Sequence, residues 1–398
     1  MSNNIQIELS ATNVYHFLNG HCGGVYHVVR NLIIYSRNPA IKNHVIYVIE
    51  KERFPEWEHL SIGSGCSEYV FRYSHHENIY HVYSRLAKKI PGDAVLVAHD
   101  WFELGMVSAI GMCNRVVYFL HGNYDYYFSL LDTHKKDIDT VLCISRSSFD
   151  QVSGIRFNAE QVFHFKFPVA TVPFTYKDFS KLKVAVIAEN LTDPNKGVSF
   201  IREINQSMVL KAIPVEWHLA GNGFTQESLK MWWGNMNNLP IYYGYLTQDQ
   251  LIDFFAGANI FILPSLNEGV PVSLVEAMKA GLVPVIANWA ANVSQLVVDR
   301  ETGFVLQDSS VSSYASAFAS IYGNHHQSQQ ISVSASSIAN IQFDPFLQVD
   351  EFESHLLQAS EPKTRSKRKV YGSRLDNEII PNKITIILRK LKSICTLH

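Results

Sequence analysis

Several features that would place this sequence in a class at once are missing from it. The formal net charge is only −2 over 398 residues, so the composition does not indicate a nucleic-acid partner. The five cysteines are odd in number and never form a Cys-x-x-Cys pair, which argues against a disulfide framework and a zinc knuckle. No apolar run reaches the roughly 18 residues of a membrane-spanning helix, and the N-terminus lacks a signal-peptide pattern. We therefore expect a cytoplasmic protein.

Two nucleotide-binding motifs are also missing. Neither NGHCGG (19–24) nor AGNGF (220–224) completes Gly-x-Gly-x-x-Gly, and no Gly-x4-Gly-Lys-Ser/Thr sequence occurs. The sequence therefore lacks the main evidence for a dehydrogenase or a P-loop enzyme. The sequence Asp137-Ile138-Asp139 directly precedes an apolar run, and we interpret it as incidental. No bound metal is predicted.

What the sequence does have is a regular alternation of short apolar runs and amphipathic stretches. This alternation is typical of repeated β-α units around parallel sheets that are buried on both faces. The predicted strands form two sets: residues 14–18, 44–50, 67–73, 94–99, 115–121 and 140–145, then residues 183–189, 215–221, 240–245, 259–265, 283–288 and 303–307. Because strongly twisted sheets rarely exceed about ten strands, we predict an α/β protein with two Rossmann-like domains.

The domain boundaries are predicted from breaks in this alternation. Pro168 and Pro173 interrupt the pattern, so the first domain is expected to cover residues 1–172 and the second residues 173–344. A helical stretch over residues 345–362 is expected to cross back onto the first domain. Residues 363–398 are expected to form a basic linker and an amphipathic helix.

The C-terminal tail is rich in basic residues. Residues 361–374 contain six lysines and arginines and almost no apolar residue, which predicts a solvated linker. After it, one helical face collects the apolar side chains Ile384, Ile387, Leu388, Leu391 and Ile394, with basic residues around the rest. Two interpretations stay open: a helix docked on one of the domains, or a helix lying on an anionic membrane surface, which would make the protein peripheral to the inner face of a membrane.

Candidate binding residues follow the predicted strands, because ligands of open α/β sheets bind beyond the carboxyl ends of the strands. Gly23 and Gly24 precede a helix whose N-terminus would favour an anion, although plain turn chemistry is the alternative. His121 ends the strand at residues 115–121, where a purely structural histidine is the alternative. Lys196 could meet phosphate oxygens as a mobile point charge, or could be only a surface lysine. Gly221 and Gly223 could form a loop in which the backbone approaches a ligand closely, or only a plain turn.

The stretch NEGVPVSLVEAMKAG (267–281) is the most informative one. A proline suits the first turn of a helix and a glycine its end, so we predict a helix from near Pro271 to Gly281. Its two carboxylates could accept bonds from the vicinal hydroxyls of a sugar, and its first amides are not used by the helix itself. The expected ligand contacts are Glu268, Gly269, Val270, Pro271, Val272 and Glu276. For either glutamate, a helix-dipole partner or a solvated helix residue is the alternative.

Taken together, these segments resemble the retaining glycosyltransferases of the GT-B fold, whose two Rossmann-like domains face each other across a cleft. They are most similar to glycosyltransferase family 4. EGVPVSLVE (268–276) looks like the E-x7-E segment of that family. The Gly-Gly loop at 23–24, His121-Gly122, the Asn-Lys-Gly at 195–197 and the Gly-x-Gly at 221–223 follow in the same order.

The resemblance implies a role for each of these residues. A UDP- or GDP-linked sugar would bind mainly to the second domain and the acceptor to the first. Glu276 would hold the ribose hydroxyls and Glu268 the hydroxyls of the donor sugar, while Lys196 and the amides after Gly269 would stabilise the diphosphate. His121 would contact the donor sugar near the reacting carbon, and Gly24 would let the first domain close on the phosphates.

One residue departs from the family pattern. Asn190 stands where the family has an arginine, which implies a weaker grip on the leaving diphosphate or a different basic partner. The predicted function is a retaining, metal-independent hexosyltransferase without a cofactor besides the nucleotide sugar. It would act on a glycan or lipid-linked acceptor in the biosynthesis of cell-surface polysaccharide. The alternatives are a nucleotide-sugar epimerase of related fold and a catalytically silent binding or scaffold subunit.

Overall fold

The protein folds as two compact units, each with its own parallel sheet. The computed structural model describes residues 11–21, 23–265, 268–287, 292–358 and 363–395, the last three of them by their backbone only. Unit 1 comprises Met1–Phe165 and Val349–His398, and unit 2 comprises Lys166–Gln348. None of the described helices is long and apolar enough to cross a membrane.

The sheet of unit 1 has seven parallel strands in the order β3-β2-β1-β4-β5-β6-β7. The strands are β1 (Thr12–Leu18), β2 (Ile41–Glu50), β3 (Cys66–Tyr73), β4 (Val95–Ala98), β5 (Arg115–Leu120), β6 (Thr140–Cys143) and β7 (Val162–His164). The first six coincide with the six predicted runs. β7 was not predicted, because three residues with one buried side chain are too few to show a pattern.

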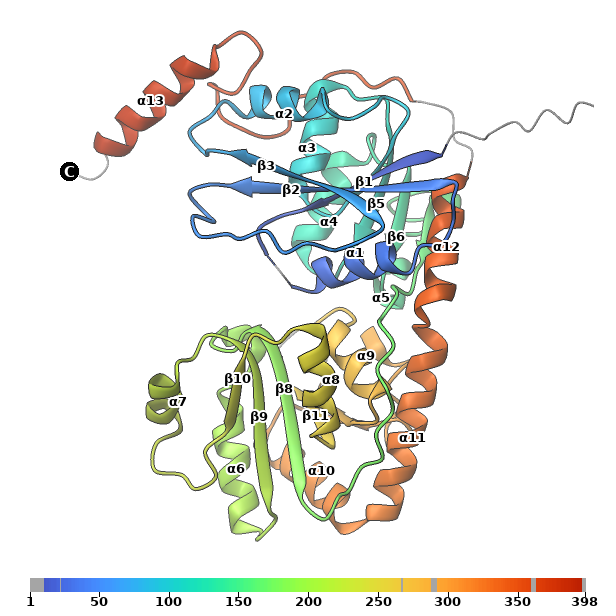
Figure 1. The fold of residues 1–398 in the computed structure, drawn as a ribbon, viewed down its shortest axis with the longest axis vertical. Helices are drawn as coiled ribbons and strands as arrows, with labels where there is room; N and C mark the ends of the chain where they lie inside the picture. The colour runs from blue at the N-terminus through green and yellow to red at the C-terminus, as the bar shows by residue number, and fades with distance from the viewer. Residues whose placement is uncertain (1–10, 22, 266–267, 288–291, 359–362, 396–398) are drawn as a thin grey trace, which may run out of the picture. The chain divides into compact units, whose positions relative to one another are not determined.

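Helices cover both faces of this sheet (Figure 1). They are α1 (Gly24–Ile34), α2 (Ile79–Ala87), α3 (Trp101–Ile110), α4 (Asp125–His134), α5 (Arg146–Val152) and α12 (Pro345–Leu357), which begins in unit 2. A further helix of unit 1, α13 (Asn382–Cys395), lies at its border and covers neither face. Successive strand residues point to opposite faces. Phe17 accordingly packs with α2, α3 and α4, whereas the next residue, Leu18, packs with α1.

The sheet of unit 2 has six parallel strands in the order β10-β9-β8-β11-β12-β13. The strands are β8 (Leu182–Asn190), β9 (Val215–Asn222), β10 (Ile241–Gly244), β11 (Ile260–Leu263), β12 (Val283–Ile286) and β13 (Phe304–Val305). All six coincide with predicted runs. The expected fold class, α/β with two parallel-sheet domains, is confirmed.

The helices of unit 2 are α6 (Phe200–Leu210), α7 (Gln226–Trp233), α8 (Gln248–Ala256), α9 (Val272–Lys279), α10 (Val311–Gly323) and α11 (His325–Gln342). One core cluster joins α6, α7 and α10 to the sheet, while α9 and α11 contact β12 and each other. α9 begins and ends where its sequence predicts. Pro271 is its N-cap, and Gly281 follows its last turn with φ +86°, a conformation that glycine adopts without strain.

Both sheets reverse their strand order at one point. In unit 1 the chain moves outward from β1 in one direction and from β4 in the other, and in unit 2 the same happens at β8 and β11. Loops after two such neighbouring strands leave in opposite directions and open a crevice at the carboxyl edge of the sheet. The candidate binding residues are therefore those that follow β1, β4 and β5 in unit 1 and those that follow β8 and β11 in unit 2.

The expectation of a solvated basic linker is wrong for residues 363–381, which we call the C-terminal strap. The side chain of Arg365 is only 4% exposed and donates hydrogen bonds to the carbonyl oxygens of Met112, Asn114 and Asp137. It also pairs with Asp139 at 2.6 Å. Arg365 and Arg368 thus find buried acceptors on unit 1, whereas Lys367 and Lys369 stay exposed, and the strap belongs to the fold of this unit.

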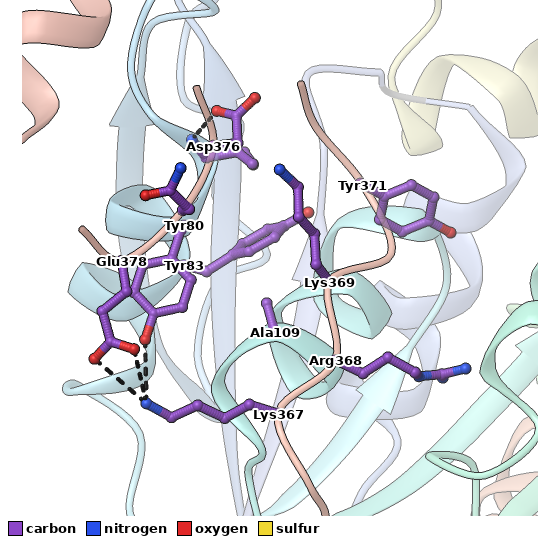
Figure 2. A pocket seen from close by; sticks show the side chains of 11 residues that line it. Tyr80, Tyr83, Ala109, Lys367, Arg368, Lys369, Tyr371, Asp376 and Glu378 are labelled. Carbon is purple, nitrogen blue, oxygen red and sulfur yellow. Dashed lines mark hydrogen bonds and ion pairs between the residues drawn. The ribbon is translucent and has the colours of Figure 1, made fainter. Parts of the chain in front are cut away.

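Figure 2 shows the strap crossing over α2 and α3. It closes a cavity of about 190 Å³ against these helices. Lys367 reaches the hydroxyl of Tyr80 at 3.3 Å and the carboxylate of Glu378, while Arg368 points the other way to Asp137, at 2.7 Å. Both aspartates of the Asp137-Ile138-Asp139 sequence therefore bind the strap.

Candidate functional site

In unit 2, the loops after β8 and β11 meet through an ion pair. Lys196 ends a short 3₁₀ helix, η2 (Pro194–Lys196), and its Nζ donates to Oε1 of Glu268 at 2.7 Å. The two side chains are 29% and 12% exposed. Gly197 permits this approach, because it has φ +63° and a Cβ there would lie 2.0 Å from the carbonyl oxygen of Pro264. Two of the three side chains predicted as catalytic are thus in direct contact.

This ion pair can also serve a bound anion. An ammonium group has three N–H donors, of which Glu268 uses one. Glu268 stands just before α9, and within the described residues no side chain caps the N-terminus of that helix. The predicted contacts lie at this N-terminus: Val272 is the first residue of α9, Pro271 is its N-cap, and Gly269 and Val270 directly precede the cap. An anion held here would meet a cation and a helix N-terminus together.

Glu276 lies one turn further along α9 and is 4% exposed. It is therefore not a solvated helix residue. Its Oε1 accepts a long hydrogen bond, 3.5 Å, from the amide of Gln248 at the start of α8. The same helix is fixed from below by Lys279, which donates to the carbonyl oxygens of Val169 and Phe343 at 2.7 and 2.9 Å. Because α9 is anchored in this way, the carboxylate of Glu276 has a well-defined position.

Asn190 uses its side chain to shape the loop after β8. Its Oδ1 accepts from the backbone N–H of Thr192 at 3.0 Å and from the hydroxyl of the same residue at 2.7 Å. A Cβ on Gly223 would lie 2.5 Å from this oxygen, and one on Gly221 would lie 1.7 Å from the carbonyl oxygen of Ala188. The two predicted glycines thus let the ends of β8 and β9 close together, and Asn190 holds that loop instead of reaching out as an arginine would.

In unit 1, His121 follows β5 and contacts a second histidine. Its Nε2 lies 2.9 Å from Nδ1 of His99, which follows β4, so one ring donates a hydrogen bond to the other. Burial lowers the pKa of His121 to about 3, and burial, then His121 and His16, lower the pKa of His99 far below its ordinary value. Both rings are therefore neutral at neutral pH. Whichever way the shared proton lies, Nδ1 of His121 has the opposite hydrogen-bonding role to Nε2.

Side chains also tie together the loops that follow β1, β4 and β5. The amide of Asn19, after β1, donates to Oδ2 of Asp100 at 3.4 Å, and the hydroxyl of Tyr126 donates to Oδ1 of the same aspartate. Gly23 is the N-cap of α1 and Gly24 its first residue. Gly23 has φ −84°, a value open to any residue, so what distinguishes it here is that it has no side chain. These contacts define one polar edge on unit 1.

Glu103, in the first turn of α3, gives this edge a pH dependence. It is 3% exposed, and its Oε1 accepts from the N–H groups of His99 and Asp100 at 2.5 and 2.6 Å. Burial, and then the charge of Asp100, raise its pKa to about 8. Between the ordinary value and pH 8 the folded state therefore holds a proton that the unfolded chain releases, so stability falls as pH rises through this range.

We expect the variant Glu103→Gln to lack this loss, because its amide oxygen can accept the same two bonds without titrating. Relative to the wild type it should gain on the order of 2 kcal/mol in unfolding free energy between pH 5 and pH 8. Urea unfolding at the two pH values measures the gain. Glu103→Ala is the control, since it leaves both N–H groups without an acceptor and should be less stable at either pH. Parallel pH profiles of the wild type and Glu103→Gln would contradict the assignment.

The sequence prediction missed several residues of both edges. These are His99, Asp100, Tyr126 and Gln248. The signal that selected His121, a polar residue at the end of a predicted strand, also marks His99, which ends the predicted strand at residues 94–99, and Asp100, which follows it. For Tyr126 and Gln248 no such signal exists, because each reaches the edge from a helix.

Few of the described residues could hold a metal ion. One group of His, Cys, Asp and Glu has its potential ligand atoms within 4.8 Å of one another: Glu50, Glu52 and His75. Glu50 ends β2, while Glu52 and His75 follow β2 and β3. The described cysteines are free thiols, and Cys22 and the side chain of Cys395 lie outside the described residues. The carboxylates of Asp137 and Asp139 face arginines.

Sequence comparisons relate unit 2 to a known family. Residues 183–324 match the family described as glycosyl transferases group 1. An uncharacterized glycosyltransferase of Haemophilus influenzae is 26% identical over 117 residues, which cover 29% of this chain and 33% of that protein. The amylovoran biosynthesis glycosyltransferase AmsK of Erwinia amylovora is 24% identical over 193 residues, 44% of this chain and 47% of that protein. The matched part of the chain thus spans a third to a half of the length of these relatives.

Structural comparison covers most of the chain. The solved structure of Anabaena HepE in complex with UDP and glucose has a TM-score of 0.66 at 16% identity, over 88% of this chain and 100% of that one. At such low identity the likeness concerns the fold alone. It shows that the chain has the GT-B fold with two parallel-sheet α/β domains.

Proposed function

We propose that this protein is a retaining, metal-independent glycosyltransferase of family 4. It transfers a hexose from a UDP- or GDP-linked donor to a hydroxyl of a glycan or lipid-linked acceptor. The observation that carries the proposal is the Lys196–Glu268 pair at the switch point of unit 2, within the segment that matches the glycosyltransferase model. Glu276 on the adjoining helix adds a second, buried carboxylate.

The site in unit 2 suits a nucleotide-diphosphate sugar. Lys196 and the N-terminus of α9 offer positive charge where the leaving diphosphate develops negative charge. The two N–H donors of the Lys196 ammonium that Glu268 does not use would donate hydrogen bonds to phosphate oxygens. Glu268 then accepts from hydroxyls of the sugar, and Glu276 from hydroxyls of the ribose. The solved relative with UDP and glucose is consistent with a donor of this class.

In the proposed reaction, the bond between the anomeric carbon and the diphosphate oxygen breaks while the acceptor oxygen bonds to the same face of that carbon. The proton of the acceptor hydroxyl passes to the departing diphosphate. No metal is needed for this step if the lysine and the helix N-terminus neutralise the leaving group. The neutral His121 contributes a hydrogen bond near the reacting carbon and not a charge. His99 holds its ring in one orientation.

For the acceptor, we propose a growing cell-surface polysaccharide or its lipid-linked precursor. A relative named for amylovoran biosynthesis supports this choice. A lipid-linked acceptor would be bound at a membrane surface. The basic and apolar residues of α13 suit a peripheral contact with such a surface.

Two other functions make different predictions. A nucleotide-sugar epimerase of related fold would consume the donor with no acceptor present. A catalytically silent binding or scaffold subunit is favoured by one observation, the use of Asn190 to hold its own loop where the family has an arginine. Donor turnover that depends on an added acceptor excludes both.

Donor binding can be tested first by thermal unfolding with UDP and with GDP. One of the two nucleotides should raise the unfolding midpoint of the wild type. Glu276→Gln should weaken binding of that nucleotide about tenfold or more, because an amide is a weaker acceptor for ribose hydroxyls than a carboxylate. Glu227→Gln, at an exposed glutamate of α7 in the same unit, is the matched control and should bind like the wild type. Equal affinities of the two variants would remove the ribose role of Glu276.

A further inference from the structure

Helix α13 exposes the apolar face that a docked helix would bury. Its side chains Ile384, Ile387, Leu388 and Leu391 are between 45% and 58% exposed. At about 100° per residue these four positions form one continuous stripe along the helix. Figure 1 shows α13 at the border of unit 1, next to α2, and not against either face of the sheet. The side chain of Ile394, also predicted for this face, lies outside the described ones.

The opposite side of α13 is fastened to unit 1 by polar contacts. Arg389 pairs with Asp376 at 2.5 Å and donates to the carbonyl oxygens of His75 and Glu77. Thr385 is fully buried, and its hydroxyl donates to the carbonyl oxygen of Leu375 at 3.3 Å. Arg389 and Thr385 occupy the same side of the helix, one turn apart. The helix is therefore held by its polar side, with the apolar stripe turned outward.

The start of the helix is fixed as well. The side chain of Asn382 accepts from the backbone N–H of Asn78 at 2.7 Å and donates to Glu77 at 3.1 Å. Asn78 in turn donates to the carbonyl oxygens of Asn377 and Ile380 in the strap. The strap and α13 thus form one assembly on α2, so the outward direction of the stripe is part of the fold of unit 1.

Basic residues line the stripe on both flanks. Lys383 and Lys390 lie on one side of it and Lys392 on the other, and all three are exposed. No acidic residue occurs between Pro381 and Cys395. A narrow apolar stripe between basic flanks is the pattern of a helix that lies in the interface of an anionic bilayer, with its apolar side among the acyl chains.

The attachment point of α13 connects this surface to the candidate site. His75 and Glu77 follow β3, so Arg389 fastens the helix at the carboxyl edge of the sheet in unit 1. Gly23, His99 and His121 follow β1, β4 and β5 at the same edge. A parallel sheet has all these strand ends on one border.

We propose that α13 is a membrane-docking surface that binds anionic phospholipid through its stripe and its lysines. The fixed helix holds the carboxyl edge of unit 1 next to the bilayer. This placement lets an acceptor whose anchor stays in the membrane reach His121. The last step rests on the proposed function, whereas the lipid contact of α13 does not.

A second copy of the chain is a poorer occupant of the same stripe. Four half-exposed side chains offer far less than the roughly 800 Å² per partner that a stable dimer buries. A dimer would also bring the lysines of two copies together. An anionic bilayer surface instead carries the charge opposite to that of these exposed lysines.

Vesicle sedimentation of the full chain tests the lipid contact. The wild type should sediment with vesicles of phosphatidylglycerol and phosphatidylcholine, release at high salt, and bind weakly to phosphatidylcholine alone. The double variant Ile387→Ser with Leu391→Ser should lose about tenfold or more in vesicle affinity. Ile341→Ser, at an isoleucine of α11 that is 70% exposed, is the matched control and should bind like the wild type. Lys383→Gln should lose about fivefold.

Three results would overturn the proposal. The first is unchanged sedimentation of the double variant, and the second is equal binding of the wild type to both kinds of vesicle. The third is a wild type that is dimeric without vesicles while the double variant is monomeric. Unaltered thermal unfolding of the double variant shows that its fold is intact, because both side chains are exposed.

Hydrogen exchange tests the fixed direction of the helix. Vesicles should slow amide exchange in α13 and in residues 74–80 of the wild type, but only in α13 of the variant Arg389→Gln, which loses its grip on His75 and Glu77. Protection of residues 74–80 that survives this substitution would contradict the positioning role of Arg389. Nucleotide binding by the same samples separates the two proposals. If vesicle binding stands while UDP and GDP never bind, the proposed function fails and the lipid contact remains.

Discussion

Replacing Lys196 by methionine is expected to lower donor turnover by about 10²- to 10³-fold, since removal of one preformed electrostatic partner of a leaving group has effects of this size. The ammonium of Lys196 stands at the switch point of unit 2 with two N–H donors beyond the one that Glu268 uses. Methionine has a similar length and no charge. Asn190 stands where the family that the sequence resembles has an arginine. Lys196 is then the one cation on the described loop after β8, residues 191–199, and should carry most of the charge compensation. Steady-state kinetics with the nucleotide sugar found by the UDP and GDP screen measures the loss.

The substitution also leaves Glu268, 12% exposed, without its partner, so lower stability has to be separated from lost catalysis. The double variant Lys196→Met with Glu268→Gln removes both charges and should restore much of the stability while turnover stays low. Lys181→Met is the matched control, because Lys181 forms a comparable 2.6 Å pair with Glu216 at an exposed position of the same unit. Full turnover by the double variant would falsify the catalytic role of Lys196.

The sheets could be predicted from the sequence, and the residues of the candidate site selected from it, for a simple physical reason. Strands buried on both faces are continuous apolar runs, and ligand-binding residues of such sheets directly follow these runs. Lys196, Glu268 and His121 were found by this rule, and Lys196 proved to touch Glu268 across 72 positions of sequence. β7 could not be found, because a three-residue edge strand has too few side chains to show its pattern.

What could not be predicted are contacts whose partner lies far away in the chain. The proton-sharing of His99 and His121 requires the register of β4 against β5. The strap is the clearest case. Its arginines predict a solvated segment from composition alone, and the Asp-x-Asp sequence near residue 138 predicts nothing by itself. Only the fold brings Arg365 to Asp139, 226 positions away, and explains both features at once.

The second large effect is therefore expected at Arg365. Its two terminal nitrogens donate to three backbone carbonyl oxygens at 2.7 to 2.9 Å and to the carboxylate of Asp139. Arg365→Gln cannot reach all four acceptors and leaves a buried carboxylate short of its partner. We expect a loss of about 3–5 kcal/mol in the stability of unit 1. Arg365→Lys, which keeps the charge but not the paired geometry, should lose less.

The measurement must report on each unit separately, because a protein of two compact units need not unfold in a single two-state transition. Native-state hydrogen exchange does so: Arg365→Gln should speed exchange in α3 of unit 1 and leave α10 of unit 2 unchanged. Lys363→Gln is the matched control, because Lys363 pairs with the same Asp139 but is 44% exposed, and such pairs contribute less than about 1 kcal/mol. If the two variants exchange alike in α3, the strap is bound without stabilising unit 1. If they differ as expected, the strap is part of the fold of unit 1, and α13, which Arg389 fastens to Asp376 of the strap, is held on a stable surface.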